Sequence, residues 1–258
     1  MSGVLQAMEP RLVLFGLVLT RISGLFLALP MLSGEIVPLR LRAAAAAAIA
    51  FVLSMPMSTA PLPQGPAALG AAAVGELLVG VALGLLVRLA LGAAEAMGSL
   101  LSMQMGLGFS GVVDPLTQSE GPLAALFALA AWALLLALNG HHELLRGVND
   151  SLRALPPGAA LRGGAEPLLL RLVESGGQIF AAALRIATPV AAALLGTNVA
   201  MALLARVAPK VNLLMLSFLI AAGMGLLALA ISGPSMARAM SDHLLTALGR
   251  MRAFALGR

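Results

Sequence analysis

Long apolar runs separated by short breaks constrain the fold of this chain more than any other feature. Six such segments lie at about 12–30, 41–55, 67–105, 122–138, 177–205 and 211–231. A helix needs about 20 mainly apolar residues to cross the hydrocarbon core of a bilayer. Only helices and closed barrels satisfy every backbone polar group in lipid. The sequence therefore predicts an all-α, polytopic membrane protein in which residues 1–258 form one integral membrane domain.

The amino-acid composition agrees with a membrane location. Of the residues, 60% are hydrophobic and 10% are charged, whereas a soluble domain carries about 25% charged residues. The net charge of +5 does not indicate nucleic-acid binding, because the basic residues are scattered and only 3% of residues are aromatic. Contacts with membrane lipids account for the basic residues better. The chain has no cysteine, which excludes disulfides and thiolate chemistry.

Two further regions surround the last apolar segments. The polar stretch 141–175 predicts short helices and loops outside the bilayer. Pro234 predicts the end of the sixth segment. An amphipathic helix is then expected over about 235–256, lying on the membrane or on a partner. Its apolar stripe consists of Met236, Met240, Leu244, Leu248, Met251 and Ala255.

The loop 106–121 is the most unusual break between apolar runs. Its candidate functional residues are Gly106, Gly108, Phe109, Gly111, Val112, Val113, Asp114 and Pro115. Irregular backbone at membrane depth survives only where protein or water covers it. The loop therefore predicts a plug, a lining or a hinge, with a plain flexible link as the alternative. Its GxGxxG pattern fits a dinucleotide site poorly, because a helix and not a strand precedes it.

Charged residues interrupt several of the apolar segments. They are Arg21, Glu76, Arg88, Glu95 and Arg185, and Arg206 follows in a tight basic turn. A charge in lipid is costly, so each is expected to pair within the chain or with another subunit, or to line an ion path. The GxxxG pattern at 80–84 favours close helix packing, although such patterns arise often by chance in glycine-rich chains.

Asn139, Gly140 and His141 form a helix-end motif, because Asn-Gly ends an apolar run in the manner of a C-cap. A metal site at His141 and His142 is not expected, since zinc sites need three or four convergent ligands and the third histidine, His243, is distant in the sequence. A proton relay there stays open. No nucleophile–base arrangement or phosphate-binding loop is evident. The sequence predicts no catalytic residue, no metal, no cofactor and no enzyme.

Four short stretches carry a resemblance to a known family. They are PMLSGEIVP at 30–38 with Arg40, MQMGLGF at 103–109 followed by Val113, Asp114 and Pro115, LNGH at 138–141, and ARVAP at 205–209. In this order they resemble the FliR family, the R-type membrane protein of the bacterial flagellar export gate. The similarity covers nearly the whole chain. The chain departs from the family in lacking tyrosine, in its few aromatics and in His142, which follows His141 where the family varies.

The resemblance implies a non-catalytic subunit of the flagellar type III export gate in the bacterial inner membrane, within the basal body. It implies assembly with P- and Q-type subunits, contacts with B- and A-type components, and unfolded flagellar proteins as the exported substrates. Bent helical hairpins would pack in an oligomeric, conical assembly raised largely out of the bilayer plane. The loop 106–121 would lie inside the conduit and help to close it.

Two other classes of function remain as alternatives at this stage. A small secondary transporter or ion channel would use Arg21, Glu76 and Arg185 as a relay, and the isolated subunit would then be active. Many transporters are built from internal repeats, and no clear repeat is evident here. A membrane metalloenzyme at His141 and His142 would hold a bound metal.

Overall fold

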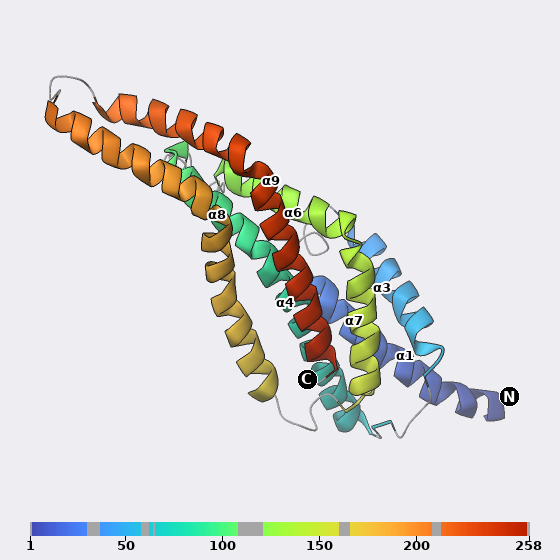
Figure 1. The fold of residues 1–258 in the computed structure, drawn as a ribbon. Helices are drawn as coiled ribbons and strands as arrows, with labels where there is room; N and C mark the ends of the chain where they lie inside the picture. Colours follow the sequence, from blue (N-terminus) through green and yellow to red (C-terminus); the bar gives the residue numbers. More distant parts are fainter. Residues whose placement is uncertain are drawn as a thin grey trace. The chain divides into compact units, whose positions relative to one another are not determined.

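The computed structural model describes residues 2–29, 37–57, 62–63, 65–107, 121–159, 166–207 and 213–256, and Figure 1 shows its ribbon. The helices are α1 (Ser2–Ala28), α3 (Leu39–Ser54), α4 (Pro66–Gln104), α6 (Pro122–Ala137), α7 (Gly140–Ala154), α8 (Glu166–Val207) and α9 (Leu213–Ala255). These ranges contain no strand. The prediction of an all-α fold is confirmed.

Four helices of the described chain are long and apolar enough to cross a membrane. These spans are Glu9–Ala28, Pro66–Gln104, Ala181–Val207 and Met215–Ala255, and the bent pair α6 and α7 provides a fifth if the two count as one span. The polytopic prediction is confirmed. The segment predicted at 41–55 is not among the candidate spans. Its helix α3 has 16 residues, or about 24 Å of length, against a hydrocarbon core of about 30 Å.

Proline lies inside several helices without ending them. Pro234 lies within α9 and Pro189 within α8. The prediction that Pro234 ends the sixth segment was therefore wrong. A proline removes one backbone hydrogen bond, and a long packed helix keeps its bonds on both sides and bends instead. Both helices are drawn as bent ribbons in Figure 1. Helix α8 also begins at Glu166, well before the predicted start at 177.

The apolar stripe of the chain's C-terminal part is covered by the protein itself. Met236, Met240, Leu244, Leu248, Met251 and Ala255 are all 4% exposed or less. On α7, a Cβ atom added at Gly147 would lie 2.3 Å from Cε of Met251, so the two residues are in direct contact. The three- and four-residue spacing of this apolar stripe was correctly identified. The stripe is covered by other helices of the chain, whereas a membrane surface or a partner was expected to cover it.

The chain divides into two compact units. The first comprises residues 1–89, 140–176 and 246–258, and the second comprises 90–139 and 177–245. In the first unit α3 packs against α1. Its buried apolar side chains lie mainly on α1, α4 and α7 at spacings of three and four residues, as on the inward face of an amphipathic helix. They include Leu14, Val18, Ile22, Leu25, Val79, Leu83, Leu144, Val148 and Leu152.

The second unit has its own buried apolar residues, from α4, α6, α8 and α9. They include Met97, Leu101, Met105, Leu123, Leu135, Ile186, Val190, Leu194, Met236 and Met240. Large parts of the two long helices in this unit remain uncovered. Only 11% of the most apolar window of α8, and 11% of that of α9, is buried within the chain.

Candidate functional site

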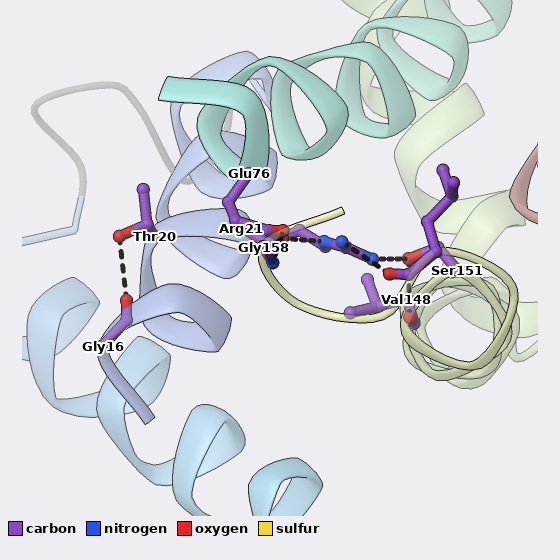
Figure 2. Close-up of polar contacts among 8 residues, drawn as sticks. Gly16, Thr20, Arg21, Glu76, Val148, Ser151 and Gly158 are labelled. Carbon is purple, nitrogen blue, oxygen red and sulfur yellow. Dashed lines mark hydrogen bonds and ion pairs between the residues drawn. The ribbon is translucent and has the colours of Figure 1, made fainter. Parts of the chain in front are cut away.

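A fully buried ion pair lies at the centre of the first unit. The Arg21 side chain on α1 and the Glu76 side chain on α4 are both 0% exposed, and Arg21 Nε donates to Glu76 Oε2 at 2.6 Å. Figure 2 shows the guanidinium extending from α1 toward α7. An isolated charge in a low-dielectric interior costs several kcal/mol, so burial of this kind requires every polar group nearby to be satisfied.

The remaining donors and acceptors of the pair bind α7 and the turn that follows it. Arg21 Nη1 donates to Ser151 Oγ at 3.2 Å, and Nη2 donates to the Leu155 carbonyl at 2.9 Å. Ser151 Oγ donates onward to the Val148 carbonyl at 2.7 Å. The other oxygen of the Glu76 carboxylate, Oε1, accepts from the Gly158 amide at 2.9 Å. The network therefore joins three segments that are far apart in the sequence.

The contact with Leu155 also completes the end of α7. The last carbonyls of a helix have no partner within the helix, and the C-terminal end of a helix attracts a cation. The Arg21 guanidinium supplies both the hydrogen bond and the positive charge at this position. The Arg21 side chain thus caps the C-terminal end of α7, which Pro156 and Pro157 also terminate.

Close contact between the backbones of α1 and α4 places Arg21 beside Glu76. A Cβ atom added at Gly80 would lie 1.9 Å from the Arg21 carbonyl oxygen, and one added at Gly84 would lie 2.7 Å from the Leu25 carbonyl oxygen. On the opposite helix, a Cβ atom at Gly24 would lie 2.5 Å from the Leu77 carbonyl oxygen. The GxxxG pattern at 80–84 therefore marks a true helix crossing.

This geometry suits a structural and positioning role. Both carboxylate oxygens of Glu76 and all three nitrogens of the Arg21 guanidinium are engaged in hydrogen bonds. Neither side chain is accessible to water, which a relay for protons or ions requires. Arg185, the third member of the predicted relay, is exposed on α8 in the second unit.

The other charges identified in the sequence lie at different depths. Arg88 on α4 and Arg206 at the end of α8 are exposed, and Glu95 on α4 is half-buried. Neither arginine has an ion pair within the described ranges. Of the five charges in the predicted apolar segments, the described structure brings Arg21 and Glu76 together.

The helix-end motif has the geometry of a turn between two helices. Asn139 has a φ of 55°, the left-handed conformation that asparagine tolerates better than most residues. Its backbone N–H donates to the Leu136 carbonyl at 3.0 Å, and α7 begins at the buried Gly140. His141 and His142 are exposed with ring centroids 4.2 Å apart. Within the described ranges no group of three or more possible metal ligands is present.

A second ionic cluster in the first unit was not predicted from the sequence. Arg252 on α9 contacts Asp150 at 3.2 Å and Glu143 at 3.3 Å, and Glu143 also accepts from Arg146 at 2.5 Å. The sequence signal that could have shown this cluster is the seven-residue spacing of Glu143 and Asp150, which places both acids on one face of α7. The Arg252 side chain is 42% exposed, so water screens these pairs and each contributes little to stability.

The predicted loop 106–121 lies mostly outside the described residues, which contain only its first two positions and its last. Gly108, Phe109, Gly111, Val112, Val113, Asp114 and Pro115 fall outside them. At the first end, Gly106 has a φ of +72° and its Cβ position lies 2.4 Å from the Phe218 ring. At the other end, a Cβ atom at Gly121 would lie 2.7 Å from Ser102 Oγ. Both ends are therefore in tight contact with the second unit.

The helices on either side of this loop also touch each other. A Cβ atom added at Gly98 of α4 would lie 2.5 Å from the Leu123 carbonyl oxygen and 2.6 Å from Cα of Ala124 on α6. Met105, near the end of α4, is 1% exposed and packs along Gly225 of α9. The loop thus leaves from and returns to a closely packed base.

Comparison with known proteins gives a consistent family. A family model described as bacterial export proteins, family 1, matches residues 12–247. The Escherichia coli K12 protein named flagellar biosynthetic protein FliR is 32% identical over 205 residues, which are 78% of this chain and 76% of the relative. The protein of the same name from Bacillus subtilis 168 is 30% identical over 200 residues, 77% of each chain. The Caulobacter vibrioides protein of that name is 26% identical over 225 residues, 85% of this chain and 89% of the relative.

Proposed function

The chain belongs to the bacterial export proteins, family 1, and we propose that it is a non-catalytic core subunit of the flagellar type III protein export gate. With P- and Q-type subunits it forms the conduit for unfolded flagellar proteins, and it contacts B- and A-type export components. We place it in the bacterial inner membrane, within the flagellar basal body.

The observation that carries this proposal is the extent of the family match. The match over residues 12–247 includes parts of both compact units and of every described helix. The proposal is also supported by the apolar surface that α8 and α9 leave uncovered, with 11% of each apolar window buried. A gate subunit requires such surface for contacts with other subunits and with membrane lipids.

Closure of the conduit is assigned to the loop 106–121. Its ends at Gly106 and Gly121 are held by contacts that leave no space for a side chain, so the loop has a fixed base. Phe109, Val112 and Val113 provide apolar groups, and hydrophobic constrictions in pores exclude water and ions. The apolar part of the loop seals the conduit when no substrate is present.

The geometry of the buried pair argues against the transporter alternative. A relay through Arg21 and Glu76 requires groups that exchange partners, whereas both are 0% exposed and bonded to three structural segments. Arg21 and Glu76 are instead assigned to holding the first unit together.

Assembly is the first test of the proposed function. The chain is expressed with and without its P- and Q-type partners, extracted in mild detergent and measured by native mass spectrometry. A large complex that holds this chain together with both partner types supports the proposal. A self-sufficient monomer or homodimer that binds neither partner contradicts it.

The seal is tested separately in the assembled complex. Residues 109–113 are replaced by a Gly-Ser segment of equal length, and residues 116–120 are replaced in the same way as the matched control. The first replacement is expected to leave assembly intact and to make the membrane leaky to small ions, and the control is expected to keep the seal. An intact seal after the first replacement contradicts the plug role and leaves the assembly result unaffected.

A further inference from the structure

The first unit contains a pocket that none of the roles above uses. Its volume is about 300 Å³ and it lies where α1, the end of α3 and the end of α7 meet. Most of its wall is apolar, and its polar groups come from one helix. The lining residues are Leu14, Pro56, Met57, Leu62, Asn149, Leu152, Arg153, Pro156 and Pro157. An apolar wall with a few placed polar groups is the usual composition of a small-molecule site.

The wall of this pocket is held in place by the buried ion pair. Pro156 and Pro157 lie between Leu155, whose carbonyl accepts from Arg21, and Gly158, whose amide donates to Glu76. Proline fixes its own φ angle, so both ends and the middle of this turn are restrained. A pocket restrained before binding loses little conformational entropy when a ligand enters.

The polar side of the pocket carries the positive charge of Arg153. Asn149 and Arg153 are four residues apart on α7 and so lie on the same face. The carboxylates nearest in the sequence are already bonded, since Glu143 and Asp150 contact Arg252. Arg153 has no ion pair within the described ranges. An exposed guanidinium beside an amide and an apolar wall is complementary to an anion that carries hydrocarbon.

We propose that this pocket binds an anionic phospholipid. The phosphate is held by the Arg153 guanidinium and the Asn149 amide, and the glycerol and the first acyl carbons lie against Leu14, Met57 and the prolines. Basic pockets between membrane helices are known binding places for anionic headgroups. The volume accommodates the headgroup and the start of the acyl chains.

The test measures lipid retained by the full chain in native mass spectrometry after addition of phosphatidylglycerol or phosphatidylethanolamine with identical acyl chains. Wild-type protein is expected to retain phosphatidylglycerol preferentially. Arg153→Gln is expected to lower that retention about tenfold, the size of a lost hydrogen bond to a charged group. The matched control is Arg88→Gln, because Arg88 is also an exposed arginine of the first unit and does not line the pocket.

A second variant tests the apolar wall without changing charge. Leu62→Trp fills the pocket and is expected to reduce phosphatidylglycerol retention while the helical content by circular dichroism stays unchanged. Equal retention of the two lipids by wild type overturns the proposal, as does an equal loss in Arg88→Gln and Arg153→Gln. Displacement of the lipid by soluble glycerol 3-phosphate also overturns it, because the apolar wall would then contribute nothing.

Discussion

Replacing Arg21 by alanine is expected to destabilise the protein by about 3–5 kcal/mol, the cost of leaving a buried charge without its partner. The substitution removes the hydrogen bonds to Glu76, Ser151 and the Leu155 carbonyl. Among the described residues, Glu76 then keeps the Gly158 amide alone as a partner, in a position that is 0% exposed. Because folded domains are typically stable by about 5–15 kcal/mol, this loss is large enough to reduce the amount of folded protein in the membrane.

A double variant separates the lost charge pair from lost packing. Arg21→Met combined with Glu76→Leu removes both charges and keeps apolar volume, and such replacements are often neutral or stabilising. Here the Leu155 carbonyl and the Gly158 amide lose their partners, at about 1–3 kcal/mol for each group left unsatisfied. The double variant is therefore expected to be destabilised, but by less than the sum of Arg21→Met and Glu76→Leu made singly.

The assay is equilibrium unfolding of the full chain in mild detergent, followed by circular dichroism, with the membrane level of each variant measured by immunoblot. The four proteins of the cycle, wild type, the two singles and the double, give the coupling energy between positions 21 and 76, expected to be about 2 kcal/mol or more. A loss of less than about 1 kcal/mol in Arg21→Ala would refute the reasoning, since Glu76 would then not be a buried charge dependent on Arg21.

Three further substitutions test the backbone contacts, each by the unfolding midpoint of the full chain. Gly80→Ala is expected to cost about 1–3 kcal/mol or more, because its Cβ would meet the α1 backbone. The control Gly70→Ala, with nothing within 4 Å of its Cβ position, should stabilise by up to about 1 kcal/mol, and equal effects of the two variants would argue against the crossing. Asn139→Ala is expected to cost about 1 kcal/mol at its φ of 55° while Asn139→Gly changes little, and the reverse order would contradict the left-handed turn. Gly98→Ala is expected to cost about 1–3 kcal/mol, whereas Gly92→Ala, which has open space inside the same helix, should stabilise by up to about 1 kcal/mol. A tolerated Gly98→Ala would mean that α4 and α6 are not in backbone contact.

Local signals in the sequence were sufficient to place several helices. The segments predicted at 67–105 and 122–138 correspond to α4 (Pro66–Gln104) and α6 (Pro122–Ala137). Each begins with a proline, which favours the first turn because its missing N–H costs nothing there. Helix α4 also ends beside Gly106, which has a positive φ. Where glycine and proline lie at helix ends, their backbone preferences determine the boundary.

The same reasoning was wrong at Pro234, where proline lies inside a helix. The Gly-Pro dipeptide alone does not distinguish the two positions, since it occurs at both 121–122 and 233–234. The difference lies in tertiary packing, because Met236, Met240 and Leu244 beyond the proline are buried within the second unit. Burial of that stripe outweighs the one hydrogen bond that proline removes.

The partner of each buried charge could not be predicted from the sequence. Arg21 and Glu76 were both identified as buried charges. Their pairing depends on the crossing of α1 and α4, because the two residues are 55 positions apart in the chain. The GxxxG pattern marked the contact surface on α4, which is one of the two helices that cross. On the other helix, α1, the contact is at Gly24, a single glycine in an apolar run without any pattern to mark it. Ser151 and Gly158 gave no signal either, because their role depends wholly on the pair.

The buried pair also bears on how an apolar chain selects one packing arrangement. Apolar burial is non-directional, and a chain with 60% hydrophobic residues offers many helix packings of similar energy. A buried charge is tolerated only where its hydrogen bonds are complete, so the Arg21 network penalises every arrangement in which α7 is shifted along α1. We therefore advance the hypothesis that this network contributes specificity beyond its net stability, a use of buried polar groups that holds in some proteins and fails in others. The double variant at positions 21 and 76 tests this hypothesis. If its unfolding transition stays as sharp as that of wild type, the apolar surfaces alone select the packing. If the transition broadens at similar helical content, the ion pair selects the packing.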